Sequence, residues 1–192
     1  LHRGRLLGCS AAAGPAFEGG GLLHGVGAMR GAVSHIRLDE PGCSGSIEVI
    51  GNAEPVGICG SAYVDFLAEA RAAGILTPMG RLTPGAHGSE HRITESPGFG
   101  KAFDLVAGRA SGALSITERD IADLLQAKAA IAAAIKTLLG RCGLHPADLA
   151  RVYLAGSFGA QVSTRHAIAC GLLPGFRPGQ IEVVGNSSVA GA

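Results

Sequence analysis

Two glycine-containing turns carry the residues best suited to hold a ligand. Each follows an apolar segment and precedes a predicted helix, and they comprise Gly156, Ser157 and Gly159 in the first turn and Gly185 and Asn186 in the second. Glycine lets backbone approach a ligand closely, and the free N–H groups of such turns suit a phosphate or a nucleoside. Each turn taken alone is equally compatible with an ordinary strand-to-helix connection. A Walker-type phosphate loop is excluded, because no Gly-Lys-Ser/Thr triplet follows either turn.

Lys128 is a third candidate, because it interrupts an apolar stripe. A helix is predicted over 117–139, and positions 121, 124, 125, 131, 132 and 135 place apolar residues on the face that also carries Lys128. An unpaired buried ammonium costs several kcal/mol. Lys128 therefore snorkels, pairs with an acid, or meets a polar or anionic ligand in a cleft. Gln126 lies off this stripe by roughly 160°.

The loop around Glu18 is a fourth candidate. Gly14 and Gly19 give the backbone freedom on either side of this single carboxylate. Glu18 could orient a metal-bound water or cap a helix, and the alternative is a surface acid in a loop. We expect Gly14, Glu18 and Gly19 to form a phosphate or metal loop if the chain binds a nucleotide.

Other catalytic arrangements are missing from the sequence. There is no Gly-x-Ser-x-Gly motif, and His87 with His91 falls in a glycine-rich segment that we interpret as a solvated loop. The 5 cysteines include no Cys-x-x-Cys pair, so we expect no zinc or iron–sulfur site within this chain. An odd number of unclustered cysteines favours reduced thiols and a cytoplasmic protein.

Composition excludes several further classes. The formal net charge is +1 and no basic run is interleaved with aromatic residues, so we expect no nucleic-acid partner. No apolar run reaches the roughly 18–20 residues of a membrane span, so we expect no membrane partner. With 192 residues and a hydrophobic fraction of 47%, the chain is large enough for one domain or two small lobes.

The elements expected to position these residues alternate in the second half of the chain. Strands are predicted at 5–9, 33–38, 46–50, 92–94, 102–107, 151–155 and 181–184, and helices at 61–73, 117–139 and 164–170. We expect Thr117 to cap the long helix, with Asp120 completing a capping box, and Gly140 to end it. The alternation predicts an α/β fold with a mixed sheet and flanking helices. If the strands at 151–155 and 181–184 are parallel and buried, both glycine turns lie at one sheet edge.

One segment and both chain ends stand apart. Residues 80–100 are rich in Gly, Pro, His and Ser, and we expect a mobile loop or hairpin insertion there. The chain begins without Met and ends on Val189-Ala190-Gly191-Ala192, which reads as the start of a helix. We expect 1–192 to be a fragment of one domain, truncated at both ends.

Several of these stretches resemble one protein family, in the same order along the chain. They are Cys9-Ser10-Ala11-Ala12-Ala13-Gly14-Pro15-Ala16-Phe17-Glu18-Gly19, Gly57-Ile58-Cys59-Gly60-Ser61, Gln126-Ala127-Lys128-Ala129-Ala130-Ile131, Val152-Tyr153-Leu154-Ala155-Gly156-Ser157-Phe158-Gly159, Gly171-Leu172-Leu173-Pro174 and Gly185-Asn186. The family is that of the reductive activators of corrinoid proteins, and the resemblance covers nearly the whole chain. It is to their C-terminal ATP-binding domain of the actin, sugar-kinase and chaperone type.

This resemblance implies a bilobal, ribonuclease-H-like fold and a role in ATP-dependent reduction of cob(II)amide to cob(I)amide on a partner corrinoid protein. It implies ATP with Mg²⁺ in the full-length protein, a two-iron ferredoxin cluster in a separate domain, and a homodimer. Lys128 and the turn at Gly156 then fall where the superfamily contacts the nucleoside.

One departure concerns the acidic phosphate motif. No Asp-x-Gly-Thr motif occurs in this chain, so we expect no ATP turnover by the fragment alone. Two alternatives stay open: a non-catalytic dimerisation or interaction module with an actin-like fold, and an activator of another metalloenzyme.

Overall fold

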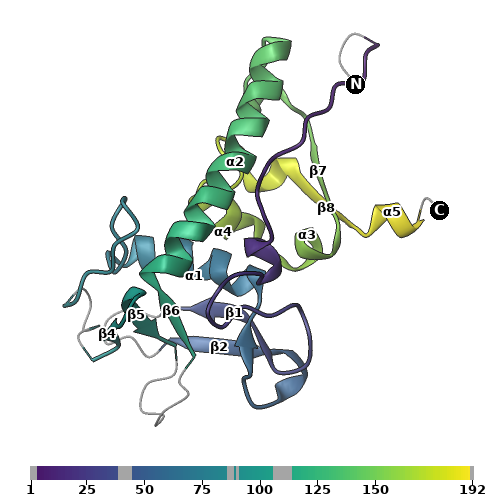
Figure 1. Ribbon diagram of the computed structural model, residues 1–192. Helices are drawn as coiled ribbons and strands as arrows, with labels where there is room; N and C mark the ends of the chain where they lie inside the picture. The colour runs from purple at the N-terminus through teal and green to yellow at the C-terminus, as the bar shows by residue number, and fades with distance from the viewer. Residues whose placement is uncertain (1–3, 39–44, 86–88, 90, 106–113, 191–192) are drawn as a thin grey trace.

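Helix α2 (Glu118–Cys142) runs from the top of the molecule down to the level of α1 and connects its upper and lower parts (Figure 1). The computed structural model describes residues 4–38, 45–85, 89, 91–105 and 114–190. Thr117 caps α2 as expected, because its hydroxyl accepts from the Asp120 N–H at 3.1 Å and the Asp120 carboxylate accepts from the Thr117 N–H at 2.9 Å. The predicted end at Gly140 is wrong. The helix continues to Cys142 and ends at Gly143, whose φ of 67° is the left-handed conformation that glycine adopts at low cost.

The lower part contains two small sheets and helix α1. The first sheet has the order β2-β1-β3, with β1 (Ala32–Arg37) antiparallel to β2 (Ser46–Val49) and parallel to β3 (Gly57–Ile58). Helix α1 (Gly60–Ala72) packs on β1, in good agreement with the predicted helix. The second sheet is antiparallel and contains β4 (Ile93–Ser96), β5 (Gly100–Asp104) and β6 (Ser115–Thr117).

The segment 80–100 includes β4, which forms a hairpin with β5. Residues 86–88 and 90 lie outside the described residues, as do 106–113, and the mobility of the segment stays a prediction. The expected strand at 102–107 is displaced to Gly100–Asp104. The expected strand at 5–9 is wrong: residues 6–13 pair with no described strand, and the side chains of Leu6 and Leu7 are 84% and 47% exposed.

The upper part holds a parallel pair of strands and short helices. β7 (Val152–Ala155) pairs with β8 (Ile181–Gly185), and α3 (Ser157–Gln161), α4 (Thr164–Ala169) and α5 (Ser187–Ala190) follow the strand ends. Four single-turn 3₁₀ helices complete the described elements: η1 (Ala16–Glu18), η2 (Ile50–Asn52), η4 (Pro146–Asp148) and η5 (Pro178–Gln180). The predicted burial of this strand pair is wrong on its outer side, where Tyr153 is 61% exposed and Val184 39% exposed. The inner residues Val152, Leu154 and Ile181 pack against the core.

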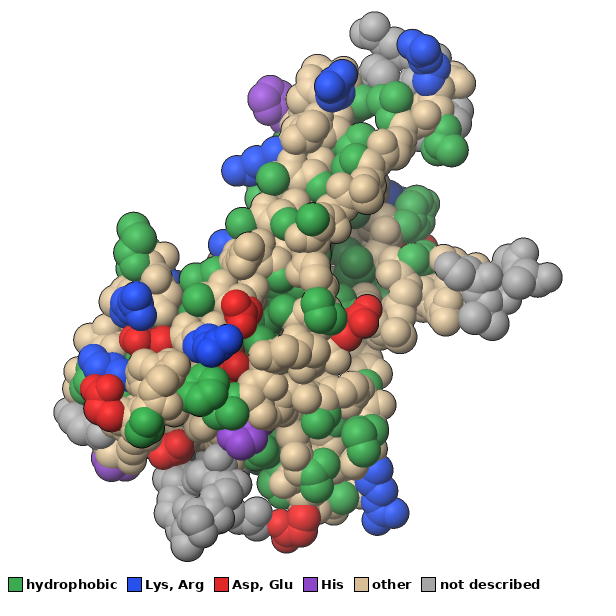
Figure 2. All heavy atoms as spheres, in the orientation of Figure 1, with side chains coloured by type: hydrophobic (Ala, Val, Ile, Leu, Met, Phe, Trp, Pro, Cys, Tyr) green, Lys and Arg blue, Asp and Glu red, His purple; other side chains and the backbone are tan. Residues whose placement is uncertain are grey.

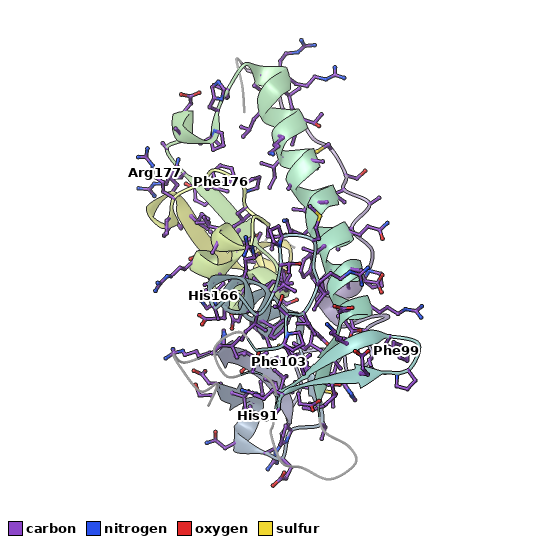
Figure 3. All side chains as sticks on the ribbon, turned by 90° about the vertical axis from the view of Figure 1, so that its left-hand side faces the viewer. His91, Phe99, Phe103, His166, Phe176 and Arg177 are labelled. Atoms are coloured by element: carbon purple, nitrogen blue, oxygen red, sulfur yellow. The ribbon has the colours of Figure 1, made fainter. Side chains whose placement is uncertain are left out.

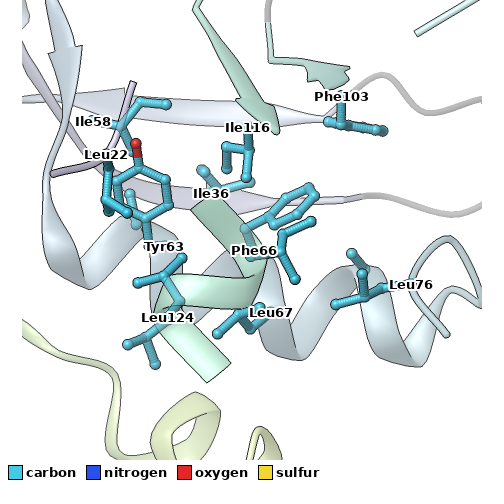
Figure 4. Packing of buried hydrophobic residues seen from close by; sticks show 14 of the residues in the cluster. Leu22, Ile36, Ile58, Tyr63, Phe66, Leu67, Leu76, Phe103, Ile116 and Leu124 are labelled. Atoms are coloured by element: carbon cyan, nitrogen blue, oxygen red, sulfur yellow. The ribbon is translucent and has the colours of Figure 1, made fainter. Parts of the chain in front are cut away.

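A single hydrophobic cluster joins the two parts. Tyr63, Phe66 and Leu67 of α1 lie at its centre, between the lower sheets and α2 (Figure 4). Ile121, Leu124 and Ala127 are the most buried apolar residues of α2. The buried stripe therefore runs through Ala127, the sequence neighbour of Lys128, and not through Lys128 itself.

On the side seen in Figure 2, neither positive nor negative side chains dominate the surface. Lys, Arg, Asp and Glu side chains are interspersed over the part that holds β4 and β5 (Figure 2). This mixture agrees with the net charge of +1. Among the described helices, none combines the length and the apolar character needed to cross a membrane.

Candidate functional site

The two glycine turns lie side by side, as the sequence predicted. β7 and β8 run parallel with Val152 opposite Ile181 and Ala155 opposite Gly185. The N–H of Gly156 donates to the carbonyl of Gly185 at 2.7 Å. The carboxyl ends of the two strands therefore meet at one edge of the sheet, which is where open α/β sheets bind ligands.

Gly156 occupies a conformation that other residues rarely adopt. Its φ is 101° and its ψ is 164°, immediately before α3. A Cβ at this position would meet no atom within 4 Å, so the space beside the turn is open. Gly159 differs, because a Cβ there would lie 2.8 Å from Leu154 Cγ. The missing side chain of Gly159 thus serves the packing of α3 on β7, whereas that of Gly156 leaves room for a ligand.

Ser157 and Glu18 line the same cavity although they are far apart in the sequence. The cavity has a volume of about 170 Å³ and lies between η1, the start of α1 and α3. Cys59, Gly60 and Ser61 form its α1 wall, and Phe158 and Gln161 extend its α3 wall. Phe17 and Phe158 stack with their ring centroids 5.5 Å apart, which holds η1 against α3. Glu18 itself is exposed, so its carboxylate is available to a ligand.

The glycine loop before β1 is built by a close backbone crossing. Gly19 has a φ of 83°, and a Cβ there would lie 2.5 Å from the Val26 N atom, so only glycine fits. Gly14 lies on the other side of the loop. It lines a second cavity of about 310 Å³ together with Asp123 and Gln126 of α2. Gly14 and Glu18 therefore line different cavities, and Gly19 lines neither of these two.

Gln126 lies off the stripe of α2 that carries Lys128, yet it also lines a cavity. It and Asp123 line the cavity under the glycine loop, beside the small Ala127. Asp123 and Gln126 are three residues apart in the sequence, so they share a helix face, and alanines lie beside them. This pattern could have predicted the cavity, because small residues allow a glycine-rich loop to approach a helix closely.

Lys128 lines a third cavity, distinct from the two described above. It is half-buried and lines a cavity of about 240 Å³ with Arg71, Leu125 and Cys170. Its Nζ atom would lie 3.5 Å from a Cβ built on Gly171. Lys128 thus faces a cleft, but it lines neither the cavity of Ser157 nor that of Gly14. Its contact with a nucleotide stays a prediction.

The neighbouring thiol is held in its neutral form. Burial raises the pKa of Cys170, while the backbone N–H of Leu172 and the ammonium of Lys128 oppose that rise. A thiol with a raised pKa carries little thiolate at neutral pH and reacts slowly. Burial therefore disfavours the thiolate form of Cys170.

The acidic residues bear on whether this part of the chain could bind a metal ion. Within the described ranges, no group of three or more His, Cys, Asp or Glu side chains is placed to hold a metal ion. Mg²⁺ at phosphate sites needs only one or two carboxylates, because the phosphates and water complete its shell. Glu18, the acid lining the first cavity, fits that requirement.

Comparisons with known proteins agree on one family. The family model described as the C-terminal domain of RACo, the ASKHA domain, matches residues 1–192. The corrinoid activation enzyme RamQ of Eubacterium limosum is 31% identical over 95% of this chain and 32% of its own length. A reductase of the Co(II) methylated amine-specific corrinoid protein of Methanosarcina barkeri is 28% identical over 97% of this chain and 34% of its own length.

A solved structure extends the likeness to three dimensions. A reductive activator for corrinoid,iron-sulfur protein superposes with a TM-score of 0.84 at 39% identity, covering 95% of this chain and 29% of that one. This chain thus spans about a third of the length of these relatives, and it has the predicted actin-like fold. The chain belongs to the family of C-terminal ASKHA domains of the reductive activators of corrinoid proteins.

Proposed function

We propose that this chain is the later part of the ATP-binding domain of a cytoplasmic, ATP-dependent reductive activator of a corrinoid protein. The observation that carries the proposal is the joined pair of glycine turns, with Ser157 and Glu18 in one cavity beside them. This arrangement is found in a chain whose family is that of the corrinoid activators. By their descriptions, the relatives named above are a corrinoid activation enzyme, a reductase of a corrinoid protein and a reductive activator for a corrinoid,iron-sulfur protein.

The described cavity supplies only one side of a nucleotide site. Its volume of about 170 Å³ is below the roughly 300–1,000 Å³ typical of small-molecule pockets. Because the relatives are about three times longer than this chain, other parts of the complete protein are expected to close the site.

The roles follow from where the residues lie. Gly156 and Gly185 would give the nucleoside and phosphates access to backbone at the sheet edge. The Ser157 hydroxyl, which lines the cavity, can donate to an oxygen of the ligand. Glu18 would hold Mg²⁺, which neutralises phosphate charge when bound. Lys128 remains our candidate for a nucleotide contact from its separate cavity. We further propose that a two-iron cluster in a separate domain supplies electrons, and that the complete protein is a homodimer.

Calorimetry of ATP binding to the complete protein tests this site. Gly156→Val introduces a β-branched residue at φ 101° and fills the open space beside the turn, so we expect ATP binding to be lost. Lys128→Ala is expected to weaken binding less. Gly179→Ala is the matched control, because a Cβ there meets nothing within 4 Å and its φ is unstrained. Unchanged ATP affinity in Gly156→Val would refute the site. A wild-type protein that binds no ATP would favour the interaction module.

A further inference from the structure

Lys128 and Arg71 line one cavity that is separate from the cavity of Ser157 and Glu18. It has a volume of about 240 Å³ and is lined by α1, the loop after α1, α2 and the end of α4. Figure 3 shows His166, which belongs to α4, at the height of α1 and above the two lower sheets. Arg71 is exposed at the edge of this cavity, so a dissolved ligand can enter it.

Lys128 is half-buried and has no acidic partner. A Cβ built on Gly171 would lie 3.5 Å from both the Cε and the Nζ atoms of Lys128. The end of the lysine side chain thus lies against the backbone that follows α4, rather than extending freely into water. Among the described residues, none forms an ion pair or a hydrogen bond with Lys128 Nζ. A partly buried ammonium without a partner favours a bound anion.

Arg71 adds a second positive charge to the same cavity. Its Nη1 atom donates to the Leu76 carbonyl at 3.4 Å, and it forms no ion pair with an acid of the described chain. A guanidinium has several N–H donors, so others remain for a ligand. Thr77 lines the cavity as well. Its Oγ1 atom accepts from the Arg81 N–H at 3.0 Å, which leaves the hydroxyl hydrogen free to donate.

Within the described chain, no counter-ion for these two charges lines the cavity. None of its described lining residues is Asp or Glu. The nearby acids of α1 are engaged with β1 and the residue after it. Asp65 accepts from the Ile36 N–H at 3.3 Å, and Glu69 accepts from the Leu38 N–H at 3.4 Å. Burial raises the pKa of the Cys170 thiol, so little thiolate is present to act as a counter-ion.

We propose that this cavity binds a phosphate group through the Lys128 ammonium, the Arg71 guanidinium and the Thr77 hydroxyl. Two like charges that share a cavity repel each other, and an oxyanion between them removes that repulsion. The planar fork of arginine matches two phosphate oxygens, and the lysine ammonium acts as a point charge. The cavity is smaller than the roughly 300–1,000 Å³ of pockets that hold whole small molecules, which suits a single group of this kind.

The phosphate group is either free inorganic phosphate or part of a nucleotide, because both present the same oxygens. The site does not depend on the proposed function, since its residues line neither the cavity of Ser157 nor that of Gly14. Binding of inorganic phosphate can therefore be measured without any nucleotide.

Calorimetric titration of the complete protein with inorganic phosphate tests the site. Lys128→Met removes the charge and keeps an unbranched side chain, and we expect phosphate binding to weaken by about tenfold or more, as for the loss of one charge-assisted hydrogen bond. Arg71→Gln should weaken binding by about threefold or more, because its guanidinium is exposed. Lys136→Met is the matched control. It removes the same charge from an exposed position of the same helix and should bind phosphate like the wild type.

The unfolding temperature of the same variants separates lost binding from misfolding. Inorganic phosphate should raise it in the wild type and in Lys136→Met by binding to the folded state. Lys128→Met should keep only the smaller rise that phosphate gives to proteins in general. Without phosphate, Lys128→Met should be at least as stable as the wild type, because the substitution removes a charge that has no counter-ion.

A competition with ATP distinguishes the two sources of the phosphate group. Displacement of inorganic phosphate by ATP, with weaker ATP binding in Lys128→Met, would assign the group to the nucleotide. Simultaneous binding would assign it to the free anion. The proposal is wrong if the wild type binds neither, or if Lys128→Met and Arg71→Gln bind both as tightly as Lys136→Met does. A wild type that binds inorganic phosphate but no ATP would refute the proposed function and leave this site intact.

Discussion

Glu118 is the residue on which several segments of the lower part converge. Its carboxylate accepts from the Leu82 N–H at 2.9 Å, from Arg81 Nη1 at 3.1 Å and from the Lys101 N–H at 3.5 Å. These donors come from the loop after α1 and from β5, so one buried acid joins both to the start of α2.

Glu118→Ala leaves the buried amide of Leu82 without its acceptor. An unsatisfied buried donor costs about 1–3 kcal/mol, and we expect a loss of this size in the free energy of unfolding, measured by urea denaturation. Glu182→Ala is the matched control, because its ion pair with Arg151 is largely exposed and should contribute no more than about 1 kcal/mol. Equal effects of the two substitutions would contradict this role of Glu118.

The positions of single residues could be predicted from the sequence where local chemistry decides the structure. Thr117 and Asp120 form the predicted capping box, and Gly156 and Gly185 meet because parallel strands end at one edge. Helical spacing placed Gln126 and Lys128 on different faces of α2, but it did not show that each of them lines a cavity. Periodicity shows which residues share a helix face, but not which segment covers each face. Gln126 lines a cavity together with the glycine loop, whereas Lys128 lines one with Cys170 and Arg71.

At the scale of elements, two glycines near the end of α2 have similar sequence surroundings but different roles. Gly140 lies inside the helix with open space at its Cβ position, while Gly143 has a φ of 67° and caps it. Position in the sequence does not distinguish them, since either could end a helix.

Opposite effects are expected from alanine at these two glycines. Gly140→Ala should raise the free energy of unfolding by about 0.5–1 kcal/mol, because alanine is the better helix former. Gly143→Ala should lower it by about 1 kcal/mol, because alanine is strained at positive φ. Thermal unfolding of both variants checks the pair. Stabilisation by Gly143→Ala would contradict the observed cap.

The strands were harder to predict than the helices, for a physical reason. A helix satisfies its own backbone, so the period of α2 and the glycines that flank α1 were sufficient to find them. A strand needs a neighbour, and the neighbour is not visible in the local sequence. Residues 6–13 have strand-like composition in part but pair with no described strand, and the outer face of β7 and β8 carries Tyr153 and Val184 without a covering layer in the described chain.

At the scale of the whole molecule, the chain spans about a third of the length of its relatives. The fold was predictable because several motifs recur in the family order, and the match extends over residues 1–192. The arrangement of the proposed site was not, because Glu18 and Ser157 are far apart in the sequence and line one cavity only in the folded chain.

Reduction of the partner corrinoid protein from cob(II)amide to cob(I)amide by the complete protein, followed by absorbance with and without ATP, tests the central proposal most directly. The wild type and Gly179→Ala should reduce the corrinoid only when ATP is present. Gly156→Val, whose strained backbone and added side chain disturb the turn that joins β7 to α3, should reduce it no faster than the wild type without ATP. Wild-type activity in Gly156→Val, or reduction that does not depend on ATP, would contradict the account.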